Sequence, residues 1–204
     1  MGIIMISVEV VLLIVGGYLA GSVPTGVILA KLFTTKDIRQ EGSGNIGATN
    51  VYRVLGARLG MLTLVGDVLK GIIPVLLALA LLGDDLWIAA VALSTFLGHL
   101  YPLFLKFRGG KGVATALGIF MGIAPLVVAC AAGVFVLVAA IWRYVSLASL
   151  AASALMPLFL GLAGYSSDYV GLGVIVGCLI FYRHGDNIKR LREGVEKKIS
   201  RNKA

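Results

Sequence analysis

Charged residues are scarce in this sequence: only 14% of its 204 residues are Asp, Glu, Lys or Arg, while 59% are hydrophobic. A soluble domain carries about a quarter charged residues, because water must solvate its surface. So many apolar side chains cannot all be hidden in one small water-soluble core. The composition therefore excludes an ordinary soluble fold and indicates a protein that lies in a lipid bilayer.

Cysteine and histidine are rare as well, with two of each in the chain. Cys130 and Cys178 lie within apolar runs, so they supply neither a disulfide framework nor a metal-ligand spacing. His99 and His184 stand on different segments, with no cluster of Cys, Asp or Glu around them. We therefore predict that the chain binds no metal ion.

Acidic residues are outnumbered by basic ones, 10 to 18, which leaves a formal net charge of +8. In a soluble protein this excess would suggest nucleic acid. Here the basic residues stand between and after apolar runs, so they first indicate membrane topology and then anionic substrates or headgroups. We predict membrane lipid as the surroundings and no nucleic-acid partner.

Several apolar runs approach the length of about 20 residues that crosses a bilayer as a helix. The first covers residues 8–32 and has neither a basic segment before it nor a clear cleavage site, which favours an uncleaved span over a signal peptide. The later runs cover residues 60–82, 86–105, 113–164 and 169–182. The chain is therefore predicted to be an all-α, polytopic membrane protein.

Basic residues indicate which ends of these runs face the cytoplasm. They gather at residues 33–58, at 106–112 and in the tail 183–203, whereas the two Asp residues at 84–85 have no basic neighbours. Cytoplasmic loops carry an excess of Lys and Arg. We therefore predict an inner-membrane protein with its N-terminus outside and with both loops and the C-terminus in the cytoplasm.

This topology needs an odd number of crossings, whereas the runs give six if residues 113–164 cross twice. The run 113–164 is longer than two spans of about 20 residues, with breaks available at Pro125 and at Arg143-Tyr144. We therefore divide it into helices at residues 113–123, 125–142 and 144–163. The chain then forms one domain over residues 1–204 with seven transmembrane helices; five spans are the fallback.

The polar loop after the first run contains the motif Gly42-Ser43-Gly44-Asn45-Ile46-Gly47. It matches the dinucleotide-binding pattern G-x-G-x-x-G, but that fingerprint follows a strand, and here an apolar helix precedes it. We therefore reject the match and predict no cofactor. Successive glycines instead let backbone amides converge on an anion.

A short helix is predicted to follow, from Gly47 to Arg53, with its positive N-terminus at the loop. Thr49 and Arg53 are four residues apart and share one face of that helix. With Ser43 and Asn45 they form a candidate site for one phosphate group. The alternative is an ordinary polar loop between two helices.

The second basic loop contains Gly109-Gly110-Lys111-Gly112 at the start of a predicted helix. Glycine amides, a lysine and a helix N-terminus suit a second phosphate, although the Walker A spacing is absent. The alternative is a flexible basic turn that only obeys the topology rule.

Five further polar residues lie in or beside the apolar runs. His99, near the inner end of its run, is either functional or a structural hydrogen-bonding residue. His184 and Asn187 lie on one side of a partly helical tail, with a solvated face as the alternative. Asp67 and Lys70, three residues apart, are expected to pair inside the bundle.

Together these residues closely resemble the bacterial acyl-phosphate:glycerol-3-phosphate acyltransferase (PlsY) family. The resemblance covers nearly the whole chain, and no motif position departs from the family's pattern. The matching stretches are residues 21–26, 37–39, 42–50 with Arg53, Asp67 with Lys70-Gly71, 98–102, 104–115, and His184 with Asn187 and Arg190-Leu191.

The resemblance implies a reaction. A fatty acyl group moves from acyl phosphate to the 1-hydroxyl of glycerol 3-phosphate, which gives lysophosphatidic acid and phosphate and begins phospholipid synthesis; neither acyl-CoA nor an acyl-carrier protein takes part. The expected glycerol 3-phosphate site is Ser43, Asn45, Thr49, Arg53, Lys111, His184 and Asn187. The expected acyl phosphate site is Gly109, Gly110, Lys111 and Gly112, facing the cytoplasm.

The catalytic candidates are Lys111, His99 and His184. Lys111 is expected to bridge both anions. Because acyl phosphate has a good leaving group, no acyl-enzyme is expected. The acceptor's hydroxyl proton passes to a histidine or to the acceptor's own phosphate, whose second pKa is about 6; we favour the phosphate, with the histidines as positioning residues.

Two other classes of function compete with this one. A transporter of a phosphorylated metabolite also needs basic groups in a helical bundle, but such transporters usually show inverted repeats and a site at the midplane. This chain shows no repeat, and its candidate residues gather at one membrane face. A purely structural subunit would leave both glycine motifs unexplained.

Overall fold

The computed structural model describes residues 7–199, and these form helices and loops without any strand. The all-α prediction is therefore confirmed for this part of the chain. The chain divides into two compact units, Met1–Ile123 and Ala124–Ala204. A single domain over residues 1–204 stays a prediction.

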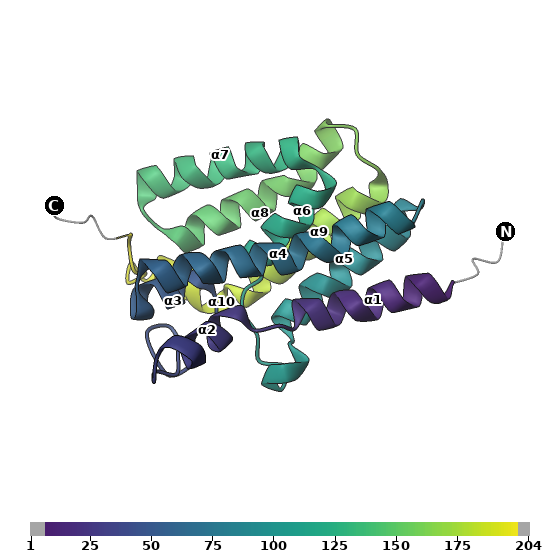
Figure 1. Ribbon diagram of the computed structural model, residues 1–204. Helices are drawn as coiled ribbons and strands as arrows, with labels where there is room; N and C mark the ends of the chain where they lie inside the picture. The colour runs from purple at the N-terminus through teal and green to yellow at the C-terminus, as the bar shows by residue number, and fades with distance from the viewer. Residues whose placement is uncertain (1–6, 200–204) are drawn as a thin grey trace. The chain divides into compact units, whose positions relative to one another are not determined.

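The first unit consists of seven helical elements among its described residues (Figure 1). They are α1 (Val8–Gly21), α2 (Thr25–Phe33), α3 (Ala48–Leu55), α4 (Ala57–Leu81), α5 (Asp85–Leu100), the short 3-10 helix η1 (Leu103–Leu105) and α6 (Val113–Ile123). The predicted helix at Gly47–Arg53 is confirmed as α3, and the helix predicted after the second glycine motif is α6.

The run predicted as the first span, residues 8–32, is not one straight helix. It forms two helices, α1 and α2, bent by 42°, and this pair stays a candidate for one span. Pro24 causes the break, because it has no amide hydrogen to continue the hydrogen-bond ladder of α1. The carbonyl of Val23 beside it accepts a hydrogen bond of 2.8 Å from Nζ of Lys70, so α4 supports the bend.

Glycines let the helices of the first unit approach closely. A Cβ added at Gly21 of α1 would lie 2.0 Å from the carbonyl oxygen of Thr95 in α5, and one at Gly118 of α6 would lie 2.1 Å from the carbonyl oxygen of Val68 in α4. Only glycine fits at such contacts. Close backbone approach of this kind stabilises helix pairs in lipid, where the hydrophobic effect between helices is weak.

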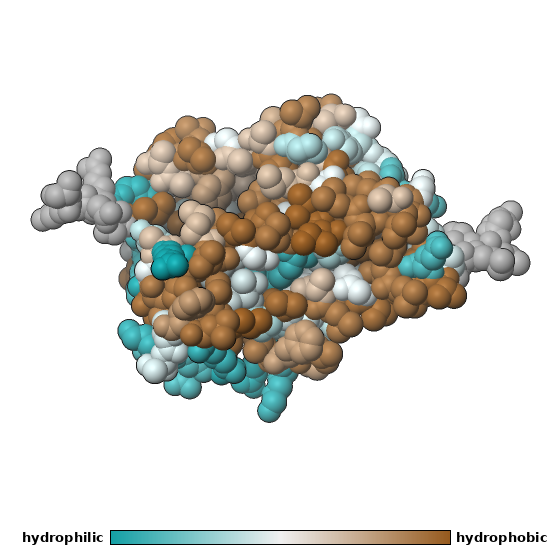
Figure 2. All heavy atoms as spheres, in the orientation of Figure 1, coloured by the Kyte–Doolittle hydropathy of each residue, from teal (hydrophilic) through white to brown (hydrophobic). Residues whose placement is uncertain are grey.

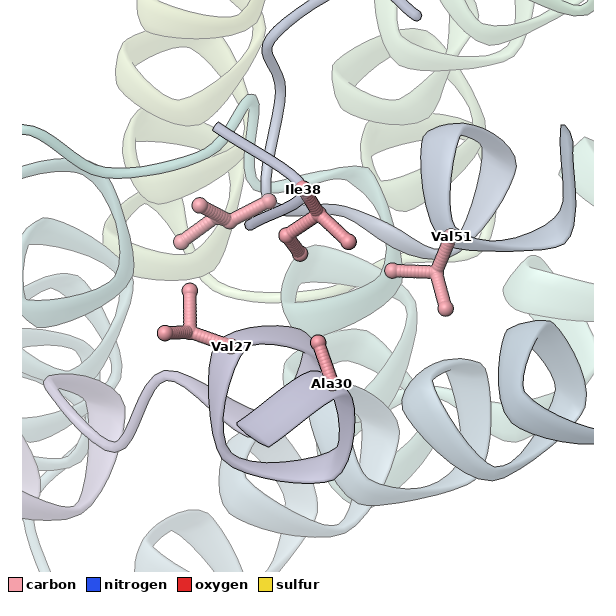
Figure 3. Packing of buried hydrophobic residues seen from close by; sticks show 5 residues of the cluster. Val27, Ala30, Ile38 and Val51 are labelled. Carbon is pink, nitrogen blue, oxygen red and sulfur yellow. The ribbon is translucent and has the colours of Figure 1, made fainter. Parts of the chain in front are cut away.

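A buried apolar cluster connects α2, α3 and the polar loop between them. Val27 and Ala30 of α2 face Ile38 of the loop and Val51 of α3, and Ile46 completes the cluster (Figure 3). Ile38 and Val51 are fully buried. The loop that bears the first glycine motif is therefore packed onto two helices.

The second unit contains α7 (Pro125–Trp142), α8 (Val145–Leu162), α9 (Ser167–Arg183) and α10 (Gly185–Arg192) (Figure 1). The predicted divisions at Pro125 and at Arg143 are confirmed, since Pro125 begins α7 and Arg143 adopts a left-handed conformation with φ of 63° between α7 and α8. The tail is partly helical, as predicted; Arg201 and Lys203 lie outside the described residues.

The end of the described tail folds back onto the turn between α7 and α8. The Ile199 amide donates to the Arg143 carbonyl, and the Arg143 guanidinium donates to the Ile199 carbonyl, both at 2.7 Å. The Lys198 ammonium lies 5.5 Å from the centre of the Tyr144 ring. The tail and this turn therefore lie at the same end of the second unit.

Four helices, α4, α5 extended by η1, α7 and α8, are long and apolar enough to span a bilayer, and the bent pair α1 and α2 makes a fifth candidate. Figure 2 shows hydrophobic residues over much of the visible surface, as lipid contact requires. α6 has 11 residues, or about 17 Å, which is shorter than a bilayer core of about 30 Å. The count of seven spans stays a prediction.

Candidate active site

One buried side chain sets the shape of the first glycine motif. The amide nitrogen of Asn50, in α3, donates to the carbonyls of Ile38 at 3.1 Å, Glu41 at 3.1 Å and Asn45 at 2.9 Å. Its amide oxygen accepts a hydrogen bond of 2.8 Å from the Ser43 backbone. Only 2% of Asn50 is exposed, so it holds the loop from within.

These contacts correct the predicted anion nest. The Ser43 amide is bound to Asn50, the Gly44 amide to the Glu41 carbonyl at 2.9 Å, and the Gly47 amide to the side-chain oxygen of Asn45 at 2.8 Å. Amides already bound inside the loop do not converge on a phosphate. The glycines serve the backbone instead, since Gly44 has φ of 70°, which other residues rarely adopt.

The N-terminus of α3 still offers donors beside this loop. Its N-cap, Gly47, has no side chain to accept a hydrogen bond from the first amides of the helix. Thr49 and Arg53 are both exposed on α3, one turn apart, and Ser43 is exposed on the loop. The structure thus presents three of the four predicted phosphate contacts at the surface. Asn45 is half-buried and braces the turn before α3.

The second glycine motif packs against the end of α5. The Gly109 amide donates to the Leu100 carbonyl and the Gly110 amide donates to the His99 carbonyl, both at 3.2 Å. A Cβ on Gly112 would lie 2.3 Å from the Phe96 ring. The predicted nest is therefore wrong for the amides of Gly109 and Gly110, which bind protein carbonyls.

Lys111 lies between these glycines and is half-buried. The glycines around it let its backbone lie directly on the last turn of α5, where any larger residue would collide. The glycines therefore let the backbone of Lys111 lie beside α5.

His99 is enclosed next to this loop. Its Nδ1 lies 3.0 Å from the hydroxyl of Thr115 in α6, and a Cβ on Gly110 would lie 2.3 Å from its Nε2. Only 3% of His99 is exposed. The ring therefore lies between α6 and the backbone next to Lys111, a place suited to positioning that lysine.

Asp67 and Lys70 pair inside the first unit, which confirms that prediction. Their charged atoms are 2.8 Å apart, and both side chains are buried. Oδ1 of Asp67 also lies 4.0 Å from Nδ1 of His99. Through Val23, Lys70 connects this polar cluster to the bend between α1 and α2.

His184 and Asn187 are buried in the second unit, so the alternative of a solvated face is wrong for both. Nδ1 of His184 lies 2.8 Å from the Ile180 carbonyl oxygen. Because a carbonyl only accepts hydrogen bonds, Nδ1 carries the proton of the neutral ring. Nε2 is then the basic nitrogen of this histidine.

Glu196 organises the tail, and no sequence pattern singled it out. Its carboxylate accepts hydrogen bonds from Asn187 at 2.6 Å and from Ser146 and Arg190 at 2.7 Å. Burial alone would raise the pKa of the Glu196 carboxyl, but the bonds from Arg190, Ser146 and Asn187 outweigh it and hold the pKa below its usual value. The amide nitrogen of Asn187 therefore serves the protein's own tail.

The sequence over residues 11–194 matches the family model described as glycerol-3-phosphate acyltransferase. The chain belongs to this family. A relative with that name from Geotalea daltonii is 52% identical over 191 residues, which are 94% of this chain and 98% of the relative. One from Geobacter sulfurreducens is 50% identical over 182 residues, or 89% and 93% of the two chains. The resemblance drawn from the motifs is confirmed.

Two crystal structures of a family member have the same fold as this chain. Both are of PlsY (YgiH), an integral membrane glycerol 3-phosphate acyltransferase. The glycerol 3-phosphate form compares with this chain at a TM-score of 0.90 and a sequence identity of 43%. For the lysophosphatidic acid form the TM-score is 0.88 and the identity 42%. Each comparison covers 94% of this chain and 96% of the other. The chain is thus an integral membrane protein of the acyltransferase family.

Replacing Asn50 by Ala should loosen the loop of the first glycine motif. The change leaves several backbone groups without their partner, at a cost of about 1–3 kcal/mol. We expect faster amide hydrogen exchange over residues 38–47, with exchange in α7 unchanged. Thr49→Ala, at the exposed residue next to Asn50, should leave hydrogen exchange in the loop unchanged. Equal exchange in wild type and Asn50→Ala would contradict this role.

Replacing Glu196 by Gln should destabilise the second unit near neutral pH by about 2 kcal/mol, the scale of a hydrogen bond to a charged group. Because folding lowers the pKa of Glu196, its stabilisation is complete above the ordinary carboxyl pKa of 4.5 and is lost as the pH falls through the lower, folded value. The difference in melting temperature should therefore shrink in acid. Glu193→Gln, on an exposed residue of the same tail, is the matched control and should melt like wild type.

Proposed function

We propose that the protein transfers a fatty acyl group from acyl phosphate to the 1-hydroxyl of glycerol 3-phosphate. The products are lysophosphatidic acid and inorganic phosphate. Membership of the family supports the acylation of glycerol 3-phosphate by a membrane enzyme. Acyl phosphate as the donor and the mechanism of transfer are proposed in addition. The observation that supports it most is the likeness, over 94% of the chain, to an enzyme solved in forms named for the acceptor and for the acylated product.

The acceptor's phosphate is proposed to bind at the N-terminus of α3. Thr49 and Arg53 supply a hydroxyl and a guanidinium from one face, and Ser43 supplies a second hydroxyl from the loop. A guanidinium binds phosphate through two parallel hydrogen bonds. Asn45 contributes by holding the turn at Gly47.

The donor's phosphate is proposed to bind at the Gly109–Gly112 loop. Lys111 supplies the charge, and the glycines bring it against α5. The donor and acceptor are both anions, so a lysine that contacts both reduces their repulsion and lets the reacting groups approach. His99 holds the loop in place from beneath Gly110.

Acyl transfer is proposed to be direct. The acceptor's 1-hydroxyl oxygen attacks the acyl carbon, the bond from that carbon to the phosphate oxygen breaks, and its electron pair leaves on phosphate. The hydroxyl proton passes to the acceptor's own phosphate, whose second pKa of about 6 suits the role near neutral pH. No protein nucleophile and no acyl-carrier protein is required.

His184 is proposed to orient the acceptor through its basic Nε2, since its Nδ1 proton is engaged by Ile180. Asn187, three residues after His184, is proposed to help orient the acceptor, although its side-chain nitrogen donates to Glu196. These assignments concern the second unit alone.

The proposed topology has seven spans, an external N-terminus and a cytoplasmic site in the inner membrane. The contacts between the described tail and the turn at Arg143 support one part of it, because that topology requires both to lie in the cytoplasm. A transporter of phosphorylated metabolites is not favoured for a member of an acyltransferase family.

The choice of donor can be tested with purified protein in detergent. With palmitoyl phosphate and glycerol 3-phosphate we expect lysophosphatidic acid and free phosphate in equal amounts, with both substrates required. Palmitoyl-CoA or palmitoyl acyl-carrier protein in place of palmitoyl phosphate should give no product. Product formed only from one of those two thioesters would overturn the proposed donor while leaving the acceptor intact.

Replacing Arg53 by Ala should mainly weaken binding of glycerol 3-phosphate. We expect its KM to rise at least roughly tenfold, the scale of one charge-assisted contact, with a smaller change in the KM for palmitoyl phosphate. Arg58→Ala removes a nearby exposed cation of α4 and is the matched control. An unchanged KM in Arg53→Ala would remove this arginine from the acceptor site.

A further inference from the structure

The first unit contains a cavity that the proposed acyl transfer does not use. It has a volume of about 250 Å³ and lies between the last turns of α2 and the residues that follow this helix. Its floor is the buried apolar side of Val27, Ala30 and Ile38, and its polar side includes Lys31, Lys36 and two threonines. One side of the cavity is thus apolar and the other is cationic.

The charge of the two lysines is not cancelled by the carboxylate on the rim. Asp37 pairs with Arg39 at 2.6 Å, and the hydrogen bonds from Arg39, with a smaller contribution from the charge of Lys31, lower the pKa of Asp37 to about 2. In the part of the chain that the structure describes, no carboxylate forms an ion pair with Lys31 or Lys36. The cavity therefore favours an anion.

The position of Lys36 relative to α2 is defined by the intervening turn. The hydroxyl of Thr34 donates to the Ala30 carbonyl at 2.8 Å and accepts from the Lys36 amide at 3.2 Å. The backbone of Lys36 is therefore tied to the last turn of α2, which bears Lys31. Two cations stand at the mouth of one cavity because of this turn.

The other faces of α2 indicate what surrounds the cavity. Ile28, Leu32 and Phe33 are exposed by 41%, 71% and 65%, and in an integral membrane protein such side chains contact lipid. The chain changes from apolar to polar at Thr34. The cavity accordingly lies where hydrocarbon meets headgroups, a level at which lysines extend their charged ends toward water.

We propose that this cavity binds the headgroup of an anionic phospholipid. Its phosphate lies between Lys31 and Lys36, and its acyl chains follow Leu32 and Phe33 along α2. A small water-soluble phosphate would contact the lysines alone. A lipid contacts the lysines with its phosphate and the exposed Leu32 and Phe33 with its acyl chains.

The test uses the full chain and measures lipid binding rather than acyl transfer. Native mass spectrometry of the purified protein counts the molecules retained on addition of dioleoyl phosphatidic acid or of dioleoyl phosphatidylcholine. We expect the wild type to retain the anionic lipid in preference. Each basic residue near an anionic membrane surface strengthens binding roughly fivefold, so Lys31→Ala with Lys36→Ala should weaken phosphatidic acid binding roughly twenty-five-fold.

Two variants make the result specific. Lys31→Arg with Lys36→Arg keeps both charges and should bind like wild type. Arg58→Ala with Lys189→Ala removes two exposed cations elsewhere and should bind like wild type as well.

Several outcomes would overturn the proposal. These are equal retention of the two lipids, unchanged retention in the double alanine variant, an equal loss in the Arg58 and Lys189 control, or displacement of the lipid by millimolar inorganic phosphate. Acyl transfer should continue in the double alanine variant, which shows that it is folded. If that variant does not fold, loss of binding in the double arginine variant overturns the site.

Discussion

The buried ion pair between Asp67 and Lys70 stabilises the part of the protein on which both glycine motifs depend. In lipid, a charge without a partner is costly, so each buried cation must be satisfied within the protein. Lys70 meets this requirement twice, with Asp67 at 2.8 Å and with the Val23 carbonyl at 2.8 Å. The second bond is made to the carbonyl of the residue just before Pro24, in the break between α1 and α2. The break between α1 and α2 is therefore part of one polar cluster with α4.

That break changes the direction of the chain before the first motif begins. α2 turns away from α1 by 42°, and its buried face then packs against Ile38 and Val51. Asn50 completes the arrangement from the other side by binding four backbone groups of the loop. The exposed Thr49 and Arg53 of α3 therefore lie beside a loop whose backbone is held in place by Asn50.

The two glycine motifs have a different physical meaning from the one that their sequences suggest. The sequences of both motifs predict that converging amides bind phosphate. In the structure, the amides of Ser43, Gly44, Gly109 and Gly110 bind groups of the protein itself. The glycines permit positive φ or close contact with a neighbouring helix. In the proposed function, the charges that meet the substrates there come from side chains, above all Arg53 and Lys111.

The sequence by itself determined the features that depend on neighbouring residues: the apolar helices, the breaks at Pro125 and Arg143, the short helix α3 and the family. Helix formation and helix breaking are local, and the i to i+3 pair of Asp67 and Lys70 is local too. Only the tertiary structure decided which amides are engaged, how Pro24 bends the first run, and that Glu196 holds Asn187 and Ser146. Ser146 and Glu196 are 50 residues apart, and no sequence period connects residues across such a distance.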